Sequence, residues 1–261
     1  MTVLNKLVDL DSYPIEDTAS PQGRALLEQG RQSLQDTAVF ALPSFIRPEA
    51  LAGMQAEARA LAPFGHHREG HRDSIGNALP SRVSVTCVGY DQIALDSPMR
   101  ALFASDALTN FLGALLQYPL FYRSVDPMAS CMLTSLSRGD ELGWHFDENN
   151  GVVTLTLDSS PKGGVFEYVP QARELSGDAL SKLMTTEVPD TDQLHHQAGT
   201  LAIFNGHDAL HRVSPVLSDT PRLTLIFSYD TQPNQIFSEQ IRMGFFNRTA
   251  PLMTPPSTPN P

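Results

Sequence analysis

The sequence predicts a mostly β domain of the α+β class, in which a jelly roll or barrel is buttressed by N-terminal helices. Two observations carry this prediction. Helix signals gather in the first half of the 261-residue chain, whereas short β-branched and aromatic runs follow one another from about residue 119. Many short strands at such spacing are typical of double-sheet jelly rolls and barrels. With 41% hydrophobic residues and no interior linker, we expect one domain over residues 1–248, with the β core at about 119–235.

Helices are expected where a start signal precedes good helix formers or apolar residues at helical spacing. The signals are an N-cap serine followed by proline, or a proline at the first helical position. They stand at Ser20-Pro21, Pro48 and Ser97-Pro98. The third helix is expected to run unbroken to Gln117, and strand-like pieces occupy Thr37–Leu42 and Arg82–Tyr90.

In the second half, strands are expected in LFYRSV, ASCMLTSLS, GVVTLTLD, GGVFEYV, GTLAIFN, HRVSPV and RLTLIFSYD, which turn-forming residues separate. A helix is expected to interrupt them around Gln171–Leu183. The tail over residues 249–261, TAPLMTPPSTPNP, is rich in prolines that remove backbone donors, so we expect it to be disordered.

Composition excludes several classes of partner. The formal net charge of -11 argues against nucleic acid and against an anionic membrane surface. Cys87 and Cys131 form no CxxC pair, and no apolar run reaches the roughly 18 residues of a membrane helix. We therefore expect a cytoplasmic protein that acts on a small molecule, with the oligomeric state left open, a homodimer included.

The motif WHFDENN places His145 and Asp147 two residues apart, at the predicted start of a strand. Residues i and i+2 of a strand face the same side. His211 follows 64 residues after Asp147, in another predicted strand. Two imidazoles and one carboxylate can cover one face of an octahedral metal and leave three positions for a co-substrate and O2. We therefore predict that these three residues bind Fe(II) and are catalytic.

Arg222 lies eleven residues after His211, in the segment PRLTLIFSYD, and Thr224 faces the same side of this predicted strand. A guanidinium that points into the barrel can hold the distal carboxylate of 2-oxoglutarate by a bidentate contact. The hydroxyl of Thr224 can add a further hydrogen bond. The order of these residues therefore predicts 2-oxoglutarate as co-substrate, with its 2-oxo acid end on the iron.

The stretches DPMASCMLTSLSRGDELGWHFDENNGVVTLTL, GGVFEYVPQAR, GTLAIFNGHDALHRVSPV and RLTLIFSYDTQP resemble the Fe(II)/2-oxoglutarate-dependent dioxygenases, in the group of free-amino-acid (lysine-type) halogenases and related hydroxylases. The likeness runs from about residue 80 to 235. It implies a double-stranded β-helix (jelly roll, cupin-like) with the same ligands and with Arg222 as the 2-oxoglutarate anchor.

The halogenases of this group have a small residue, usually glycine, at the position of Asp147, which leaves room for chloride on the metal. The carboxylate of Asp147 therefore implies a hydroxylase. The expected reaction hydroxylates an unactivated C–H bond and converts 2-oxoglutarate to succinate and CO2, with desaturation as a variant.

The resemblance also implies contacts to an amino-acid substrate, with Arg82 on its carboxylate and Glu148 on its ammonium group. A surface strand residue and a solvated loop acid are the competing interpretations. Ile226 is apolar where the lysine-binding members are polar, so the substrate need not be lysine. The alternatives are the same chemistry on a peptide, nucleotide or natural-product scaffold, and a non-catalytic ligand-binding jelly roll.

Other conspicuous residues are expected to have structural roles. The run GHHREGHR, with His66, His67 and His71, is expected to be a mobile loop, acting as a lid over the substrate. Trp144 is expected to point away from the metal and pack in the core. Both cysteines are expected to be buried.

Overall fold

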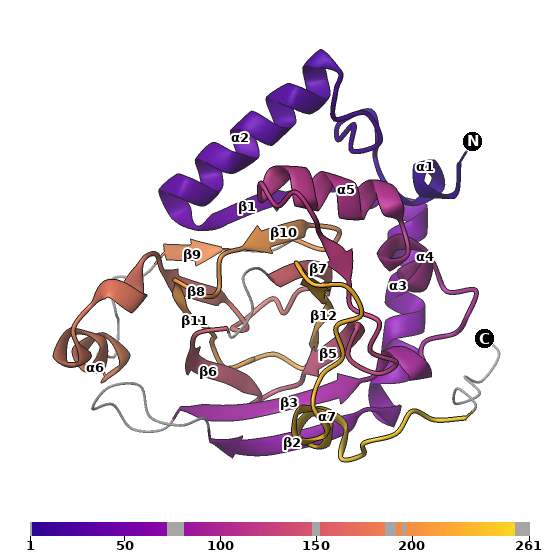
Figure 1. Cartoon of the computed structure of the whole chain (residues 1–261). Helices are drawn as coiled ribbons and strands as arrows, with labels where there is room; N and C mark the ends of the chain where they lie inside the picture. Colours follow the sequence, from indigo (N-terminus) through magenta and orange to yellow (C-terminus); the bar gives the residue numbers. More distant parts are fainter. Residues whose placement is uncertain (1, 72–80, 148–151, 186–191, 195–196, 254–261) are drawn as a thin grey trace.

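The computed structural model describes residues 2–71, 81–147, 152–185, 192–194 and 197–253. They form a double-stranded β-helix, or jelly roll, in which an antiparallel sheet curls around a central space and helices cover one side (Figure 1). The predicted fold class is confirmed. The strands are β1 (Val39–Leu42), β2 (His66–His71), β3 (Arg82–Val88), β4 (Tyr122–Arg123), β5 (Cys131–Leu136), β6 (Glu141–His145), β7 (Val152–Asp158), β8 (Phe166–Val169), β9 (Asp192–Leu194), β10 (Leu201–Phe204), β11 (Leu210–Val213), β12 (Arg222–Phe227) and β13 (Tyr229–Asp230). The helices are α1 (Val3–Leu7), α2 (Pro21–Thr37), α3 (Pro48–Leu61), α4 (Pro98–Phe103), α5 (Asp106–Leu115), α6 (Gly177–Thr185) and α7 (Glu239–Phe246).

The main sheet has the order β1-β10-β7-β12-β5-β3-β6-β11-β8-β9, with β2 paired to β3, while β13 and β4 form a separate two-stranded sheet. Strands β1, β2 and β3 come from the helix-rich first half of the chain. The β core therefore begins well before residue 119, because β1 and β3 form backbone hydrogen bonds with strands from the second half.

Two of the predicted helices are confirmed and the third is corrected. Ser20 caps α2, and its Oγ accepts a hydrogen bond from the Gly23 N–H at 3.0 Å. The third segment is two helices, α4 and α5, and not one. Ser105 lies between them and caps α5, because its Oγ accepts a hydrogen bond from the Leu108 N–H at 3.3 Å. A serine that bonds to the backbone in this way favours a new helix start over continuation.

The prediction of a mobile loop at the histidine-rich run is wrong for its described part, His66–His71. These residues form β2, which pairs antiparallel with β3 from His66 opposite Cys87 to His71 opposite Arg82. Exposure alternates along the strand, as expected for an edge strand with one face toward solvent. The pairing partner β3 decides the conformation here, and local sequence does not reveal it.

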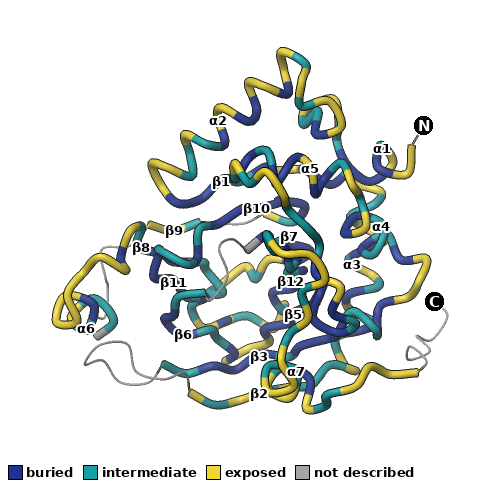
Figure 2. The backbone as a smooth tube through the Cα atoms, in the orientation of Figure 1, coloured by how far each residue is buried: buried dark blue, intermediate teal, exposed yellow. Residues whose placement is uncertain are grey.

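The alternation of β12 shows how the sheet separates core from site. Leu223, Leu225 and Phe227 belong to the large buried cluster, which also contains residues of the helices. The strands beside the helices are largely buried (Figure 2). Arg222 and Thr224 point to the opposite face, into the interior of the curled sheet. Because successive side chains of a strand alternate, the helix-covered face anchors the strand and leaves the other face for chemistry.

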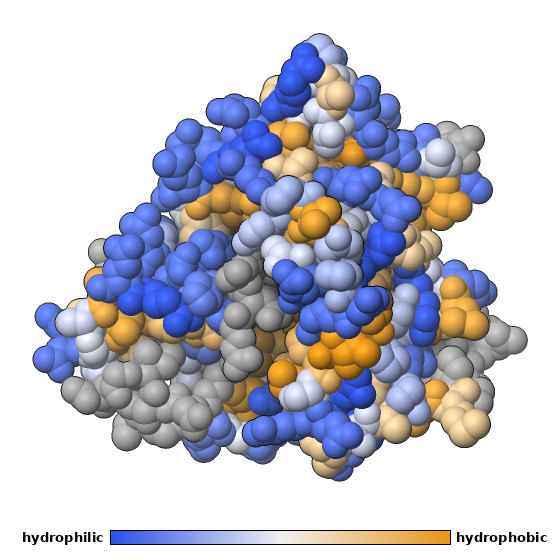
Figure 3. All heavy atoms as spheres, in the orientation of Figure 1, coloured by the Kyte–Doolittle hydropathy of each residue, from blue (hydrophilic) through white to orange (hydrophobic). Residues whose placement is uncertain are grey.

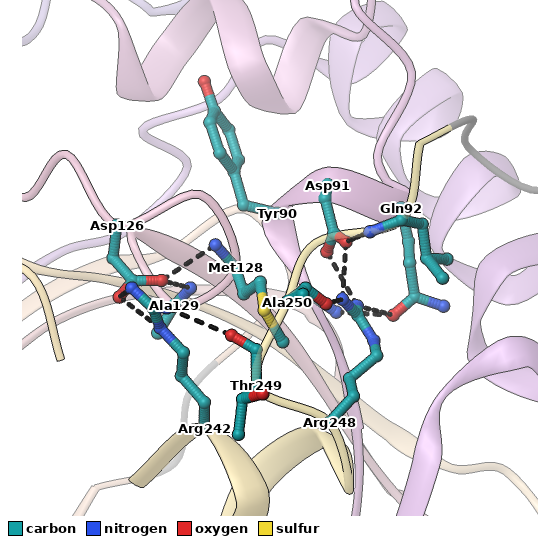
Figure 4. A network of polar contacts seen from close by, with 12 residues as sticks. Tyr90, Asp91, Gln92, Asp126, Met128, Ala129, Arg242, Arg248, Thr249 and Ala250 are labelled. Carbon is teal, nitrogen blue, oxygen red and sulfur yellow. Dashed lines mark hydrogen bonds and ion pairs between the residues drawn. The ribbon is translucent and has the colours of Figure 1, made fainter. Parts of the chain in front are cut away.

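Asp126 ties the C-terminal segment to the loop before β5 (Figure 4). Its buried carboxylate accepts hydrogen bonds from the backbone N–H groups of Met128 and Ala129, both at 2.8 Å, and of Phe237 at 2.9 Å. Arg242 of α7 donates from Nε and Nη2 at 3.0 and 2.8 Å. Burial by itself raises the pKa of Asp126, but these hydrogen bonds more than offset it and keep the pKa below its ordinary value.

A second carboxylate holds the chain beyond α7. Arg248 donates to both oxygens of Asp91 at 2.7 and 2.8 Å (Figure 4). The Leu252 N–H also donates to Asp91, at 2.6 Å. Residues 249–253, the first part of the tail expected to be disordered, therefore contact the domain. Residues 254–261 lie outside the described part of the chain. In the part that is described, no helix has the length and apolar character needed to cross a membrane.

Replacing Asp126 by alanine is expected to lower the free energy of unfolding by about 3–5 kcal/mol, because Arg242 and three N–H groups lose a buried partner. Urea denaturation measures the change. Asp219→Ala is the control and should change stability little, because its ion pair with Arg138 is exposed to solvent.

The pKa of Asp126 is lowered in the folded state, so its stabilising contribution is present above the unfolded-state value of about 3.9 and is lost as the pH falls through the folded-state pKa. The difference between wild type and Asp126→Ala should therefore shrink below about pH 4. An unchanged difference at low pH would contradict this assignment.

Candidate metal centre

Three predicted ligands meet at one point inside the curled sheet. His145 ends β6 and lies opposite His211 in the β6–β11 pair. The Asp147 Oδ1 lies 3.7 Å from the Nε2 of His145 and 3.6 Å from the Nε2 of His211. All three ligand atoms lie within 4.8 Å of one another. The motif was expected at a strand start but lies at a strand end, so Asp147 reaches the histidines from the loop after β6.

Backbone carbonyls orient both imidazoles. The Nδ1 of His145 lies 2.8 Å from the Gly143 carbonyl oxygen, and the Nδ1 of His211 lies 3.0 Å from that of Ala209. A carbonyl oxygen can only accept, so each Nδ1 carries the proton and donates it. Each Nε2 of a neutral ring then presents its lone pair to the common point, as a metal requires.

Aromatic rings enclose this point. The Phe204 ring packs edge-on against His211 with 4.8 Å between centroids, and the Phe166 ring lies 5.6 Å away. His145 and His211 are 8% and 5% exposed. This packing restricts the imidazoles to one orientation and excludes water from their flanks.

Gly206 leaves the space that the carboxylate of Asp147 occupies. The Asp147 N–H donates to the Gly206 carbonyl oxygen at 2.9 Å. A Cβ atom on Gly206 would lie 2.0 Å from the Asp147 Oδ2. A glycine is therefore needed at position 206 for the carboxylate to stand where it does.

Gly206→Ala is expected to move the Asp147 carboxylate and to weaken divalent-metal binding by roughly 10- to 100-fold, the range seen when groups that orient a ligand are removed. The metal-free protein should lose little stability, because the displaced atoms are the end of a side chain. Calorimetric titration with Co²⁺ measures the affinity. Gly53→Ala is the matched control, since a Cβ there meets nothing within 4 Å, and equal affinity in both variants would refute the prediction.

Arg222 is a buried cation at the other end of the same pocket. It is 7% exposed, and burial lowers the pKa of its guanidinium to about 10. Its Nη1 donates to the Thr224 Oγ1 at 2.7 Å. Among the described residues, no carboxylate forms an ion pair with Arg222. A buried charge without a partner raises the free energy of the folded protein, so we expect an anionic ligand to bind beside Arg222.

A row of threonines lies beside Arg222. Thr134, Thr224 and Thr156 are neighbours across β5, β12 and β7. The Thr156 hydroxyl is buried and has no hydrogen-bond partner in the described structure. Sequence reasoning singled out only Thr224, although threonine at alternate strand positions is a recognisable signal. A cation, a free hydroxyl and further hydroxyls suit the distal carboxylate of a dicarboxylic acid.

The pocket that joins these groups has a volume of about 100 Å³. Besides the metal-centre residues, Arg222 and two of these threonines, its lining is mainly apolar: Val39, Leu142, Thr154, Phe166, Leu194, Ala202, Phe204, Val213 and Ile226. Thus the structure brings together five of the seven predicted site residues.

The two predicted substrate contacts are not in this set. Arg82 is not part of the described lining, and its guanidinium donates to Glu69 at 2.9 Å and to Glu141 at 3.2 Å. Glu148 lies outside the described residues. Trp144 packs in the core as predicted, in a buried cluster with Leu210. Both cysteines are buried, which raises the pKa of each thiol.

A family model described as Halogenase D matches residues 22–240. The chain belongs to the halogenase D family. No curated protein shows a significant similarity to it. This membership agrees with the resemblance that the sequence motifs carry.

Solved structures share the fold. The epimerase SnoN from nogalamycin biosynthesis, in complex with Fe3+, alpha ketoglutarate and nogalamycin RO, is 17% identical with a TM-score of 0.56, over 79% of this chain and 84% of its own. AviO1 from Streptomyces viridochromogenes Tue57 is 19% identical with a TM-score of 0.54, over 79% and 95%. A 2OG-Fe(II) oxygenase family oxidoreductase from Burkholderia pseudomallei is 16% identical with a TM-score of 0.51, over 79% and 91%. At these identities the likeness shows the fold alone, which is that of 2OG-Fe(II) oxygenases.

Proposed function

We propose that this protein is an Fe(II)- and 2-oxoglutarate-dependent dioxygenase that hydroxylates an unactivated C–H bond of a small, amino-acid-like substrate. One observation carries the proposal: a buried two-histidine, one-carboxylate cluster shares a pocket with a buried arginine that lacks a carboxylate partner in the described structure. A simple binding module has no need for both. The buried, unpaired cysteines agree with a reducing cytoplasm.

The donor set fits the metal and the co-substrate. His145, Asp147 and His211 would hold Fe(II) by nitrogen and oxygen atoms and leave positions open beside them. Arg222 would receive the distal carboxylate of 2-oxoglutarate, with Thr224 and Thr156 nearby. Iron, 2-oxoglutarate and O2 together supply the oxidation: one oxygen atom enters the C–H bond, and the other enters succinate as CO2 leaves.

The chain's own residues orient and shield this chemistry. The carbonyl oxygens of Gly143 and Ala209 bind the two Nδ1 atoms, so that both Nε2 atoms face the cluster. Phe204 keeps water from the flank of His211. Arg222 fixes one end of the co-substrate, so that its other end meets the cluster in one orientation.

Halogenation is the second candidate, because the family model is named for a halogenase. Asp147 favours hydroxylation, since its carboxylate occupies the place that a halide would need. Its carboxylate is also built into the fold, because Gly206 makes room for it.

The decisive experiment measures succinate formation from 2-oxoglutarate, anaerobically loaded Fe(II) and O2, over a panel of basic, acidic and aliphatic amino acids. We expect Fe(II)-dependent turnover that one class of amino acid stimulates, with a product 16 mass units heavier. Reactions with added chloride test halogenation, which would give a chlorinated product instead. If the protein binds neither Fe(II) nor 2-oxoglutarate, the proposal fails. If turnover occurs but no amino acid is modified, a peptide, nucleotide or natural-product scaffold becomes the candidate substrate.

A further inference from the structure

The inward face of β12 changes from polar to apolar along its length. Arg222, Thr224 and Ile226 share this face and all line the pocket. Four residues of a strand span about 13 Å, so Arg222 and Ile226 lie at opposite ends. All six residues of β12 are described; five of them are buried, and Ile226 is partly exposed. If Arg222 holds the co-substrate, Ile226 faces the part of the pocket that remains.

Ile226 lies in the middle of a row that crosses four strands. Its neighbours are Met132 on β5 and Thr154 on β7, and Thr154 is followed by Ala202 on β10. Three of these four side chains are hydrocarbon or thioether. The next row toward Arg222 is the threonine row. A polar row and a mainly apolar row therefore lie side by side across these strands.

Further apolar side chains pack against the row that contains Ile226. Ile226 and Phe237 pack against one buried cluster, which includes Met132 and Phe246 of α7. Asp126 and Arg242 hold this C-terminal segment in place. Figure 3 shows apolar side chains at the surface over the same segment. The row therefore has a fixed apolar backing and cannot easily rearrange to admit a charge.

We propose that the part of the substrate that reaches the metal centre is an uncharged aliphatic chain, and that Ile226 selects it. This inference rests on the proposed function. Within the described lining, Asp147 is the only carboxylate, and its Oδ1 faces the two histidines. An ammonium group on the chain would lose its water against Ile226 and Ala202, which is costly without a paired anion. A methyl end gains from the same contact.

Norleucine and lysine form a matched pair for the test, since lysine adds one ammonium group to the same straight chain. With the Fe(II)-loaded full-length protein, norleucine should stimulate succinate formation at least about tenfold more than lysine, as measured by kcat/KM. Ile226→Asp should narrow or reverse this ratio, because it places an anion in this row of the pocket. Leu95→Asp is the matched control and should leave the ratio unchanged, because Leu95 is 82% exposed.

A second variant does not depend on burying a charge. Ile226→Ala enlarges the row and should shift the preference from norleucine toward the bulkier phenylalanine. If this variant leaves the preference unchanged, Ile226 is not the selecting residue.

The outcomes separate the two proposals. Binding of Fe(II) and of 2-oxoglutarate reports on the proposed function, and the absence of both would defeat that function. If both bind but lysine stimulates succinate formation as well as norleucine does, or neither amino acid stimulates it, the substrate class is overturned. If Ile226→Asp changes both substrates equally, its selecting role is overturned.

Discussion

His211→Ala is expected to reduce Fe(II) affinity and substrate-dependent succinate formation by more than about 100-fold. Loss of a group that merely orients a metal ligand costs roughly 10- to 100-fold, so loss of a ligand should cost more. The imidazole is held by the Ala209 carbonyl and enclosed by Phe204, so no described neighbour can take its place. Anaerobic Fe(II) titration and a coupled succinate assay measure the two effects.

Without metal, the same variant should keep the fold. The removed ring lines a cavity, and the strands β6 and β11 are held from their other face by the buried cluster that contains Trp144 and Leu210. His66→Ala is the control, since His66 lies on β2 outside the pocket lining. Wild-type affinity and turnover in His211→Ala would exclude the proposed metal centre, whereas equal losses in both variants would point to a general effect on folding.

Arg222→Met is expected to separate stability from function. In the protein without ligand, it removes a buried cation that no described carboxylate neutralises, so the free energy of unfolding should stay the same or rise. The KM for 2-oxoglutarate should rise steeply. Removing one partner of a buried, hydrogen-bonded ion pair costs about 2–5 kcal/mol, or roughly 30- to 4,000-fold in affinity.

Thermal unfolding with and without 2-oxoglutarate tests both parts of this prediction. Wild type should gain stability as 2-oxoglutarate is added in the presence of Co²⁺, and Arg222→Met should not. Arg138→Met serves as control, since this exposed arginine pairs only with exposed Asp219 among the described carboxylates. If Arg222→Met unfolds the protein, or binds 2-oxoglutarate normally, Arg222 has a structural role instead.

Much of the centre could be predicted because it depends on local rules. The alternation that turns Arg222 and Thr224 to one face follows from strand geometry. The two-residue spacing of His145 and Asp147 marked the motif, although Asp147 lies in the loop after β6. The histidine motif and Arg222 are also what the sequence shares with a known family. The N-caps at Ser20 and Ser97 are equally local, because a serine side chain reaches only the next turn of the backbone.

Features that depend on a distant partner were not predictable in this way. The strand His66–His71 looked like a loop, because only pairing with Arg82–Val88 makes it a strand. The hydrogen bonds of Arg82 are a second example, since Glu69 and Glu141 reach it only in the folded chain. The contact of Arg82 with a substrate stays a prediction.

The sequence by itself determined which groups this protein offers for chemistry: two imidazoles, one carboxylate and an arginine, with Arg222 on a face set by strand alternation. Only the tertiary structure decided how these side chains are positioned and which residues surround them. It placed Gly206 behind Asp147, supplied the carbonyls that set both tautomers, and aligned a threonine row beside an apolar row centred on Ile226. The reason is physical: the direction of a side chain is a local property, whereas its neighbours across the sheet depend on strand register.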